Sequence, residues 1–252
     1  MKKQSKINKE EFLKLYKQGL NDRQIAKEMS KSVSTICYFR NNILNLRPVI
    51  DTIEISKDEL EVLVGTLLGD SSILYVHKGC RYPHIQFSHS VIQRSYFNNK
   101  YQVLNKLMSS YGEYNYQSKM IIKGRECHVY PILHGVGRNL KCLVSLRETF
   151  YQNGKKLIPI NYISNIFTAK SLAYLFMDDG CKNQNSINLN LQGFETENLQ
   201  EFIKFLYNKF NLEFILKKDK TLYLRYQSVN NFLDLVTPYI INSMQYKLPC
   251  RH

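Results

Sequence analysis

The chain has 252 residues, which is enough for one large domain or for a small domain and a medium one. Hydrophobic residues make up 44% of it, so a normal core is available, but no apolar run approaches the about 20 residues that a membrane span needs. The first eight residues are basic and polar and do not resemble a secretory signal. These features favour an intracellular globular protein and do not distinguish an organellar, a bacterial or a phage-encoded one.

The cysteines point to the same kind of compartment. There are six, they are scattered, and none forms a C-x-x-C pair. This pattern is typical of buried thiols in an intracellular protein rather than of a disulfide framework. The residues are Cys37, Cys80, Cys127, Cys142, Cys181 and Cys250.

The formal net charge is +14, and both parts of the chain share it. Residues 1–50 carry 11 basic and 4 acidic side chains (11 − 4 = +7), and residues 51–252 carry 24 and 17 (24 − 17 = +7). A basic surface on both parts favours a polyanionic partner, most simply nucleic acid. A lysine-rich surface from an AT-rich genome is the alternative, and charge alone does not separate the two.

The first fifty residues predict three short helices. The helix at 10–18 is amphipathic and is broken at Gly19. Asn21 then begins a second helix, and Gln24 lies where a capping box requires it. The third helix follows the polar break at 30–32. On this helix Val33, Ile36 and Phe39 are expected to be buried, and Ser34, Thr35, Tyr38, Arg40 and Asn41 to face outward.

The stretch 25–36 resembles the helix-turn-helix of bacterial regulators and resolvases. Ala26 corresponds to the small residue that lets two helices cross, and in such motifs the third helix enters the major groove. Ser30 replaces the usual turn glycine and Lys31 replaces an apolar residue, so a helical cap without DNA contact stays open as the alternative. The resemblance implies DNA contacts from Ser34, Thr35, Tyr38 and Arg40.

Two later apolar runs with helical character end in the same way, at a carboxylate. The first motif, residues 63–71, ends at Asp70, and the second, residues 172–180, ends at Asp179, which is 179 − 70 = 109 residues further on. An acid in the last turn of a helix is disfavoured by about 0.3–1 kcal/mol, because the macrodipole is negative there. Finding it twice indicates that something other than helix stability placed the acids, such as a divalent metal between two converging helix ends.

A similar series of elements surrounds each motif. In the first copy we expect a helix over 56–70, strands at 72–76 and 84–88, a helix with Phe97, Tyr101, Leu104 and Met108 on one face, a strand at 128–133 and a helix at 139–150. In the second copy we expect a helix at 169–179, a strand at 186–192, a helix at 196–210, strands at 212–217 and 221–226, and a helix at 228–236.

The two motifs resemble the paired signatures of LAGLIDADG homing endonucleases, in the single-chain form with two pseudosymmetric halves. Two further runs, 154–159 and 244–249, are similar to the yeast mitochondrial intron-encoded members. The resemblance covers about residues 55–250, and the three ordered segments 154–159, 172–180 and 244–249 are far more specific than one nonamer.

The resemblance implies an α+β fold: two αββαββα-like halves with saddle-shaped antiparallel sheets, joined at their motif helices, plus a small all-α helix-turn-helix domain. Gly65 and Gly69 leave one face of the first motif helix bare, and Ala173 serves the second helix. Ser71 and Tyr174 depart from the family pattern. These departures affect how closely the two motif helices are expected to pack more than they affect the expected chemistry. The implied domains are residues 1–48, 55–152 and 153–252, with a linker from 47 to about Asp51.

The same resemblance implies the chemistry. Asp70 and Asp179 match the metal-binding acids, one from each half, and oxygen ligands suit Mg²⁺. Lys156 and Lys247 fall where related enzymes have active-site lysines, although a solvated lysine is the competing interpretation of Lys156. Asp178 precedes the catalytic acid and is interpreted as support at the helix end.

Alternating strands supply a candidate DNA-reading face. One face of each strand is apolar and the other carries amide, hydroxyl or basic groups, and Asn and Gln can bond the adenine edge. An ordinary solvent-facing sheet is the alternative. A zinc site at His77, Cys80, His84 and His89 is disfavoured, because the spacing is not standard and strand alternation separates the side chains. The predicted DNA-facing residues are His84, Gln86, Ser88, Asn188, Asn190, Gln192, Tyr223 and Arg225.

The sequence therefore predicts a monomeric, Mg²⁺-dependent, site-specific endonuclease that cuts both strands of a long asymmetric DNA target, in a mobile-intron setting. Two alternatives stay open. An intron-splicing RNA maturase on the same fold would need the basic surface but not the acids. A transcription regulator with a degenerate endonuclease module would need neither acid.

Overall fold

The structure is a computed structural model that describes residues 7–48, 52–77, 79–115, 119–122, 125–128 and 130–250. Of the linker predicted from residue 47 to about Asp51, residues 49–51 lie outside the described residues. The N-terminal part contains three helices and a π-helical turn, which are α1 (Lys9–Lys17), α2 (Asp22–Glu28), α3 (Val33–Tyr38) and η1 (Phe39–Ile43).

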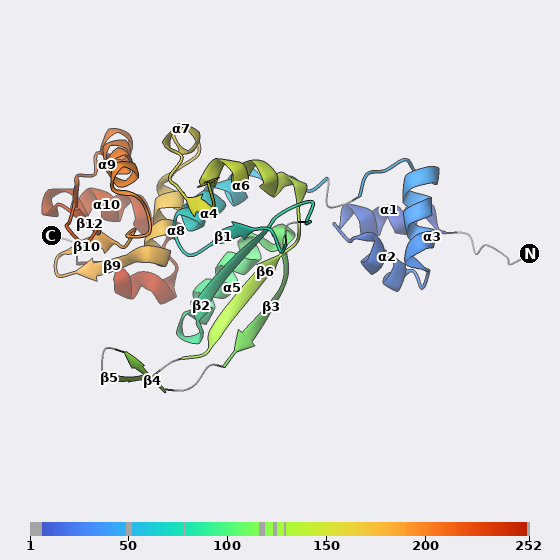
Figure 1. The fold of residues 1–252 in the computed structure, drawn as a ribbon, viewed down its shortest axis with the longest axis horizontal. Helices are drawn as coiled ribbons and strands as arrows, with labels where there is room; N and C mark the ends of the chain where they lie inside the picture. The colour runs from blue at the N-terminus through green and yellow to red at the C-terminus, as the bar shows by residue number, and fades with distance from the viewer. Residues whose placement is uncertain are drawn as a thin grey trace, which may run out of the picture.

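The three helices pack on a small core of their own, set apart from the rest of the chain (Figure 1). The predicted capping box is present, since Asn21 caps α2 and Gln24 returns a side-chain bond to the Asn21 backbone N–H. The Arg138 guanidinium of the following domain donates to the Gly19 carbonyl at 3.0 Å, where the chain turns at a positive φ. The core residues are Phe12, Ile25, Ala26, Met29 and Ile36.

Two predictions for the third helix are wrong. Val33, expected in the core, is 41% exposed. Arg40, expected to face outward, is 4% exposed, because α3 continues into the π-helical turn and directs Arg40 at Asp22 on α2. There it forms a two-pronged ion pair, with Nε–Oδ1 and Nη2–Oδ2 distances of 2.8 Å. Arg40 is therefore a structural residue of the helical domain.

The first half, from residue 52 to about 150, contains α4 (Lys57–Leu68), β1 (Ser72–Leu74), β2 (His84–Ser90), η3 (Val91–Gln93), α5 (Arg94–Val103), η4 (Asn105–Leu107), β3 (Met108–Tyr114), β4 (Lys119–Ile122), β5 (Arg125–His128), β6 (Ile132–Gly137), η5 (Lys141–Leu143) and α6 (Val144–Phe150). The remainder contains β7 (Tyr151–Gln152), β8 (Lys155–Lys156), α7 (Ile160–Ile163), α8 (Ala169–Asp179), β9 (Gly180–Asn183), β10 (Ser186–Leu189), α9 (Thr196–Phe210), β11 (Phe214–Leu216), β12 (Leu222–Leu224), η6 (Tyr226–Ser228), α10 (Val229–Val236), η7 (Thr237–Tyr239) and η8 (Asn242–Lys247).

The two halves have the same topology. One sheet has the order β1-β2-β6-β3 and the other β9-β10-β12-β11, and every pairing in both is antiparallel. Each half places a motif helix first, α4 or α8, and a second helix against the sheet, α5 or α9 (Figure 1). The predicted repeat and the α+β class are confirmed.

Several elements differ from the prediction. Met108 begins strand β3 instead of extending α5, because α5 ends at Val103 and a 3₁₀ turn follows. The strand expected at 128–133 is instead the end of β5 and the start of β6. The strands β3, β7, β8 and β9 and the helix α7 were not predicted, because their sequences are short or lack alternation.

The two motif helices approach closely because glycines line their contact. A Cβ on Gly65 would lie 2.2 Å from the Ser171 carbonyl oxygen, and one on Gly69 would lie 2.6 Å from the Asp178 Cβ. Tyr174 does not hinder this approach, because its hydroxyl donates to Asn99 Oδ1 on α5 at 2.8 Å. The bare face predicted for α4 is therefore the face that α8 covers.

Replacing Gly65 with alanine should separate these helices and destabilise the protein by about 2 kcal/mol or more, as overpacking of a rigid backbone contact does. Gly193→Ala is the matched control, since a Cβ there meets nothing within 4 Å. Urea unfolding of both variants measures the effect. Equal stabilities of the two would show that the helices do not pack as described.

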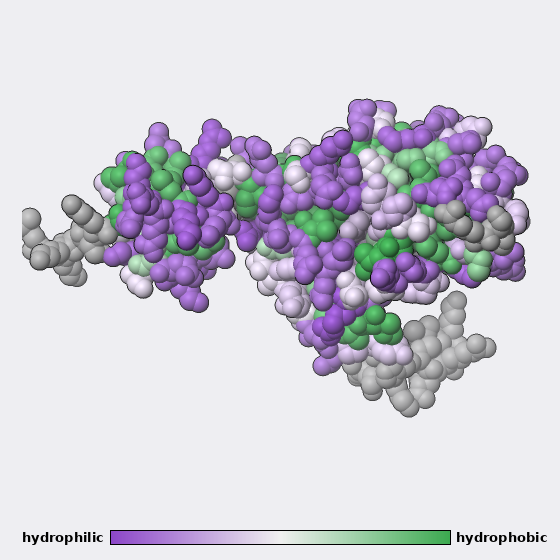
Figure 2. All heavy atoms as spheres, turned by 180° about the vertical axis from the view of Figure 1, so that it is seen from behind, coloured by the Kyte–Doolittle hydropathy of each residue, from purple (hydrophilic) through white to green (hydrophobic). Residues whose placement is uncertain are grey.

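The five cysteines whose side chains the structure describes are all free thiols. The expectation that they are buried is wrong, because four are partly exposed and Cys250 is exposed. Cys127 lies outside the residues whose side chains are described. Among the described helices, none combines the length and the hydropathy that crossing a bilayer requires. The face in Figure 2 is mainly hydrophilic, with apolar residues in separate patches.

Candidate active site

The two acidic motif ends meet at the contact between the halves. Asp70 follows the C-terminus of α4, and Asp179 is the last residue of α8. Each helix end is capped by a lysine from elsewhere in the chain. Lys156 Nζ donates to the carbonyls of Gly69 and Ser71 at 3.0 and 2.8 Å. Lys247 Nζ donates to the carbonyls of Met177 and Asp178 at 2.6 and 3.2 Å.

The two lysines reach the site from different kinds of element. Lys156 lies on the β7–β8 hairpin, whose turn residues Asn153 and Gly154 have φ values of 50° and 78°. Two consecutive positive φ angles define the tight turn that Asn-Gly pairs favour. Lys247 ends the 3₁₀ segment η8 near the C-terminus. One acid and one lysine thus lie at the end of each motif helix.

Burial and mutual repulsion raise the pKa values of both acids. The pKa of Asp179 rises to about 7, mainly through burial and then through the charges of Asp70 and Asp178. The pKa of Asp70 rises to about 6, through burial and the charge of Asp178. Burial also lowers the pKa of Lys156 to about 8 and lowers that of Lys247. Burial therefore disfavours the charged forms of both the acids and the lysines of this site.

This arrangement fits a divalent cation. Within the described part of the chain, no donor hydrogen-bonds to the carboxylate of Asp70 or of Asp179, because both lysines are bonded to backbone carbonyls. Two carboxylates with uncommitted oxygens form the hard, anionic donor set that Mg²⁺ prefers. A cation between them would remove the repulsion that raises their pKa values.

A pH-dependent stability follows for the metal-free protein. The pKa of Asp179 is about 7 in the folded chain, against an ordinary aspartate value of 3.8, so ionisation above pH 4 opposes folding. Asp179→Asn should therefore raise the Tm by several degrees at pH 8, from a gain of about 2 kcal/mol after allowance for solvent screening. The gain should vanish near pH 4. Calorimetry in EDTA measures it, and an unchanged or lower Tm at pH 8 would contradict the repulsion.

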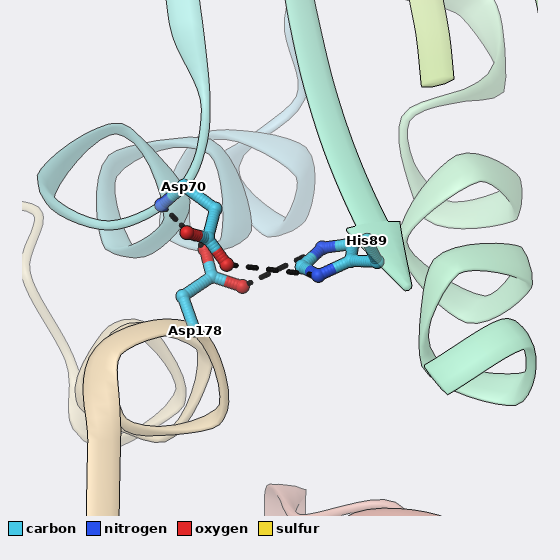
Figure 3. A group of neighbouring side chains, drawn as sticks. All are labelled: Asp70, His89 and Asp178. Carbon is cyan, nitrogen blue, oxygen red and sulfur yellow. Dashed lines mark hydrogen bonds and ion pairs between the residues drawn. The ribbon is translucent and has the colours of Figure 1, made fainter. Parts of the chain in front are cut away.

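A second group of possible metal ligands lies beside the pair (Figure 3). One oxygen or nitrogen atom from each of Asp70, His89 and Asp178 lies within 4.8 Å of the others. His89 Nδ1 is 3.6 Å from Asp70 Oδ2, and His89 Nε2 is 3.8 Å from Asp178 Oδ1. Burial and the neighbouring Lys100 lower the pKa of His89 to about 3, so its ring is neutral.

Both carboxylate oxygens of Asp178, however, already accept hydrogen bonds from the protein. Its Oδ1 accepts from Tyr96 Oη at 2.7 Å and from Lys100 Nζ at 2.6 Å. Its Oδ2 accepts from Thr66 Oγ1 at 2.6 Å and from the Asp70 backbone N–H at 3.2 Å. Burial alone would raise the pKa of Asp178, but Lys100 holds it below its ordinary value. A cation in this second group would have to displace Lys100, so Asp178 is a structural acid, whereas the carboxylates of Asp70 and Asp179 keep oxygens that no hydrogen bond occupies.

Sequence reasoning missed the partners of Asp178, but signals for them exist. Lys100 lies four residues after Tyr96 and four before Leu104 on the apolar stripe of α5, where a lysine needs a buried acid. His89 follows Ile85 and Phe87 on the inward face of β2. The disfavoured zinc site does not assemble, because in the described residues His89 joins Asp70 and Asp178 instead of the other three ligands.

A sequence profile described as the LAGLIDADG DNA endonuclease family matches residues 60–235, which is more than half of the chain. The chain belongs to this LAGLIDADG family. It is 31% identical over 208 residues to a probable intron-encoded endonuclease 1 of Wickerhamomyces canadensis, covering 77% of this chain and 85% of that protein. It is 26% identical over 235 residues to the cytochrome b mRNA maturase bI2 of Debaryomyces hansenii, covering 86% and 82%.

A solved structure of a homing endonuclease has a similar fold. The homing endonuclease I-WcaI bound to its DNA recognition sequence superposes with a TM-score of 0.68 and 28% identity, covering 79% of this chain and 89% of that one. The family match begins at residue 60, beyond the N-terminal helices α1, α2 and α3.

The first LAGLIDADG sheet presents two of its three predicted DNA-facing residues. Gln86 is half-buried and Ser88 is exposed, with the Ser88 hydroxyl 2.7 Å from His134 Nδ1. The prediction for His84 is wrong, because it is only 6% exposed. The chain after β6 covers this end of β2, where the Leu140 N–H donates to the Pro83 carbonyl at 3.0 Å.

The second LAGLIDADG sheet presents a polar cluster. Asn188 Oδ1 accepts from Asn183 Nδ2 at 3.2 Å, and Lys217 Nζ lies 4.6 Å from the centroid of the Tyr223 ring. Gln192 and Arg225 are exposed. Asn190 differs from the prediction of a free base-reading amide, because its Nδ2 donates to the Asp179 carbonyl at 3.0 Å and holds the backbone of the motif acid.

Proposed function

We propose that this chain cleaves both strands of a long asymmetric DNA site in a reaction that requires Mg²⁺. The observation that carries the proposal is the pairing of two under-bonded, mutually repelling carboxylates, one from each half, with a lysine at each helix end. Both halves lie in one chain, so a monomer holds the complete site. The different residues on the two sheets favour an asymmetric target.

Asp70 and Asp179 would hold the ion, which when bound would neutralise charge on the scissile phosphates. Lys156 Nζ has three protons and donates two of them to carbonyls, which leaves one for a water or phosphate oxygen. Its pKa of about 8 leaves a minor neutral fraction at neutral pH that could accept a proton from the attacking water. Lys247 has the same arrangement in the second half.

The sheets and the helix-turn-helix would share the binding of the duplex. On α3 the side chains of Ser34 and Thr35 are exposed, and that of Tyr38 is 59% exposed. These groups suit hydrogen bonds and stacking in a groove, beyond the footprint of the sheets.

The double variant Thr35→Ala/Tyr38→Ala should weaken binding of the target about tenfold, as the loss of one or two groove contacts does. The cleavage rate at saturating protein should not change, because the acids lie in the other domains. Gel-shift titration and single-turnover kinetics separate the two quantities. Unchanged affinity would mean that α3 does not touch DNA.

RNA maturation is a second candidate function, and the similarity to a maturase over most of both chains favours it. It predicts that intron RNA splices faster with the protein and that Asp70→Asn and Asp179→Asn keep this activity. An endonuclease that is also a maturase would lose only cleavage in these variants.

The test of the main proposal is incubation of the purified protein with a randomised DNA library and Mg²⁺, followed by sequencing of the new ends. We expect one long motif with short 3′ overhangs, and no product in EDTA. Intact DNA together with accelerated splicing of RNA would contradict the endonuclease proposal and support the maturase function instead.

A further inference from the structure

The residues that precede the two motif acids break the pseudosymmetry of the site. In the first motif this residue is Gly69, and in the second it is Asp178, whose side chain is 0% exposed. A Cβ on Gly69 would lie 2.6 Å from the Asp178 Cβ, so only one of the two positions can carry a side chain. Asp178 therefore projects from the second half into the first, and its partners on α4 and α5 all belong to the first half.

Lys100 connects Asp178 to a histidine. Its side chain is 0% exposed, and Nζ donates to Asp178 Oδ1 at 2.6 Å and to Thr66 Oγ1 at 2.8 Å. The third contact is with His89 Nε2 at 2.9 Å. An ammonium has three protons and no acceptor, so His89 Nε2 must accept this bond. The neutral ring then carries its proton on Nδ1, which lies 3.6 Å from Asp70 Oδ2, longer than a hydrogen bond. The Gln93 side chain is a further hydrogen-bond partner of this ring.

We propose that Lys100 and His89 are positioning residues for Asp70 alone, and that the two motif acids are therefore inequivalent. Lys100 fixes the tautomer and plane of His89, so that the edge of the ring with the Nδ1–H stays beside the Asp70 carboxylate. Asp178 holds the same residue from its backbone side, through the Asp70 N–H at 3.2 Å.

Asp179 has no matching support among the described residues. Its carbonyl accepts from the Asn190 N–H at 2.8 Å and from Asn190 Nδ2 at 3.0 Å, but its carboxylate accepts no hydrogen bond. The Asp70 carboxylate thus has a ring N–H beside it, at 3.6 Å, while no such group lies beside the carboxylate of Asp179 in the described residues. A disturbance of His89 should change the two strand cuts unequally, and this consequence rests on the proposed function.

The first test uses the target recovered from the library, with a different label on each strand. His89→Gln should slow the cut of one strand by about tenfold or more and leave the other within about twofold, so that nicked DNA accumulates. His77→Gln is the control, a histidine outside the site. Equal slowing of both cuts would mean that His89 has only a structural role, and unchanged rates would mean that it has none. If the native protein cuts no DNA at all, the proposed function fails.

The second test needs no cleavage. Nitrogen-15 NMR of the histidine rings in the metal-free protein should show His89 neutral and protonated on Nδ1, assigned by its loss in His89→Gln. In Lys100→Met/Asp178→Asn the buried charges are removed as a pair, and the His89 signals should move toward the Nε2-protonated tautomer. A native ring protonated on Nε2, or no change in the double variant, would overturn the inference whatever the outcome with DNA.

Discussion

Asp179→Asn should reduce the rate of DNA cleavage about a thousandfold or more while leaving the affinity for the target nearly unchanged. The carboxylate is one of the two that fit a divalent ion, and several kcal/mol of charge stabilisation in the transition state are lost without it. Asparagine keeps the size of the side chain, and Asn190 binds the backbone carbonyl of residue 179, which the substitution retains. The helix end should therefore stay in place.

Single-turnover cleavage and gel-shift titration on the same DNA measure this effect. Gln192→Ala, at an exposed position on the second sheet, is a useful comparison, because a lost base contact should weaken binding more than it slows cleavage. An Asp179→Asn protein that cleaves within about tenfold of the native rate would remove Asp179 from the chemistry.

Lys100→Met should destabilise the fold by about 3–5 kcal/mol, the largest stability effect that we expect in the chain. The substitution leaves Asp178 buried without its cation, and removal of one partner from a buried ion pair typically costs this much. Adding Asp178→Asn should restore most of the lost stability, because asparagine carries no charge and can still bond Thr66.

The matched control is Lys155→Met, which breaks an exposed ion pair with Glu195 in which Lys155 is 80% exposed. It should change the free energy of unfolding by less than about 1 kcal/mol. Urea titration at neutral pH compares the three variants. A Lys100→Met protein as stable as the control would show that Asp178 is neutral or hydrated in the folded chain.

The parts of the fold with strong periodicity were predictable from the sequence. The predicted helices at 169–179 and 196–210 coincide with α8 and α9, because both have regular apolar spacing and α8 also begins with a capping box. Strand β3 was not predictable in the same way, since its residues are mostly exposed and do not alternate. The β7–β8 hairpin was missed even though Asn153-Gly154 is a strong turn signal.

The residues of the site differ in the same way in how far the sequence predicts them. Its acids and lysines lie in local motifs, so a sequence can indicate them one at a time. The Lys100–Asp178 pair joins residues 78 positions apart, and only the folded chain brings them together. Arg40 was misassigned for a similar reason, because its partner Asp22 lies on another helix.

We propose that Asp70 and Asp179 hold the metal, while Asp178 is a structural residue. The most direct measurement is anomalous X-ray diffraction from crystals of the protein with its DNA target and Mn²⁺ in place of Mg²⁺. We predict anomalous density between the carboxylates of Asp70 and Asp179, with Lys100 still bonded to Asp178. Density centred among Asp70, His89 and Asp178, or none beside Asp179, would contradict the account.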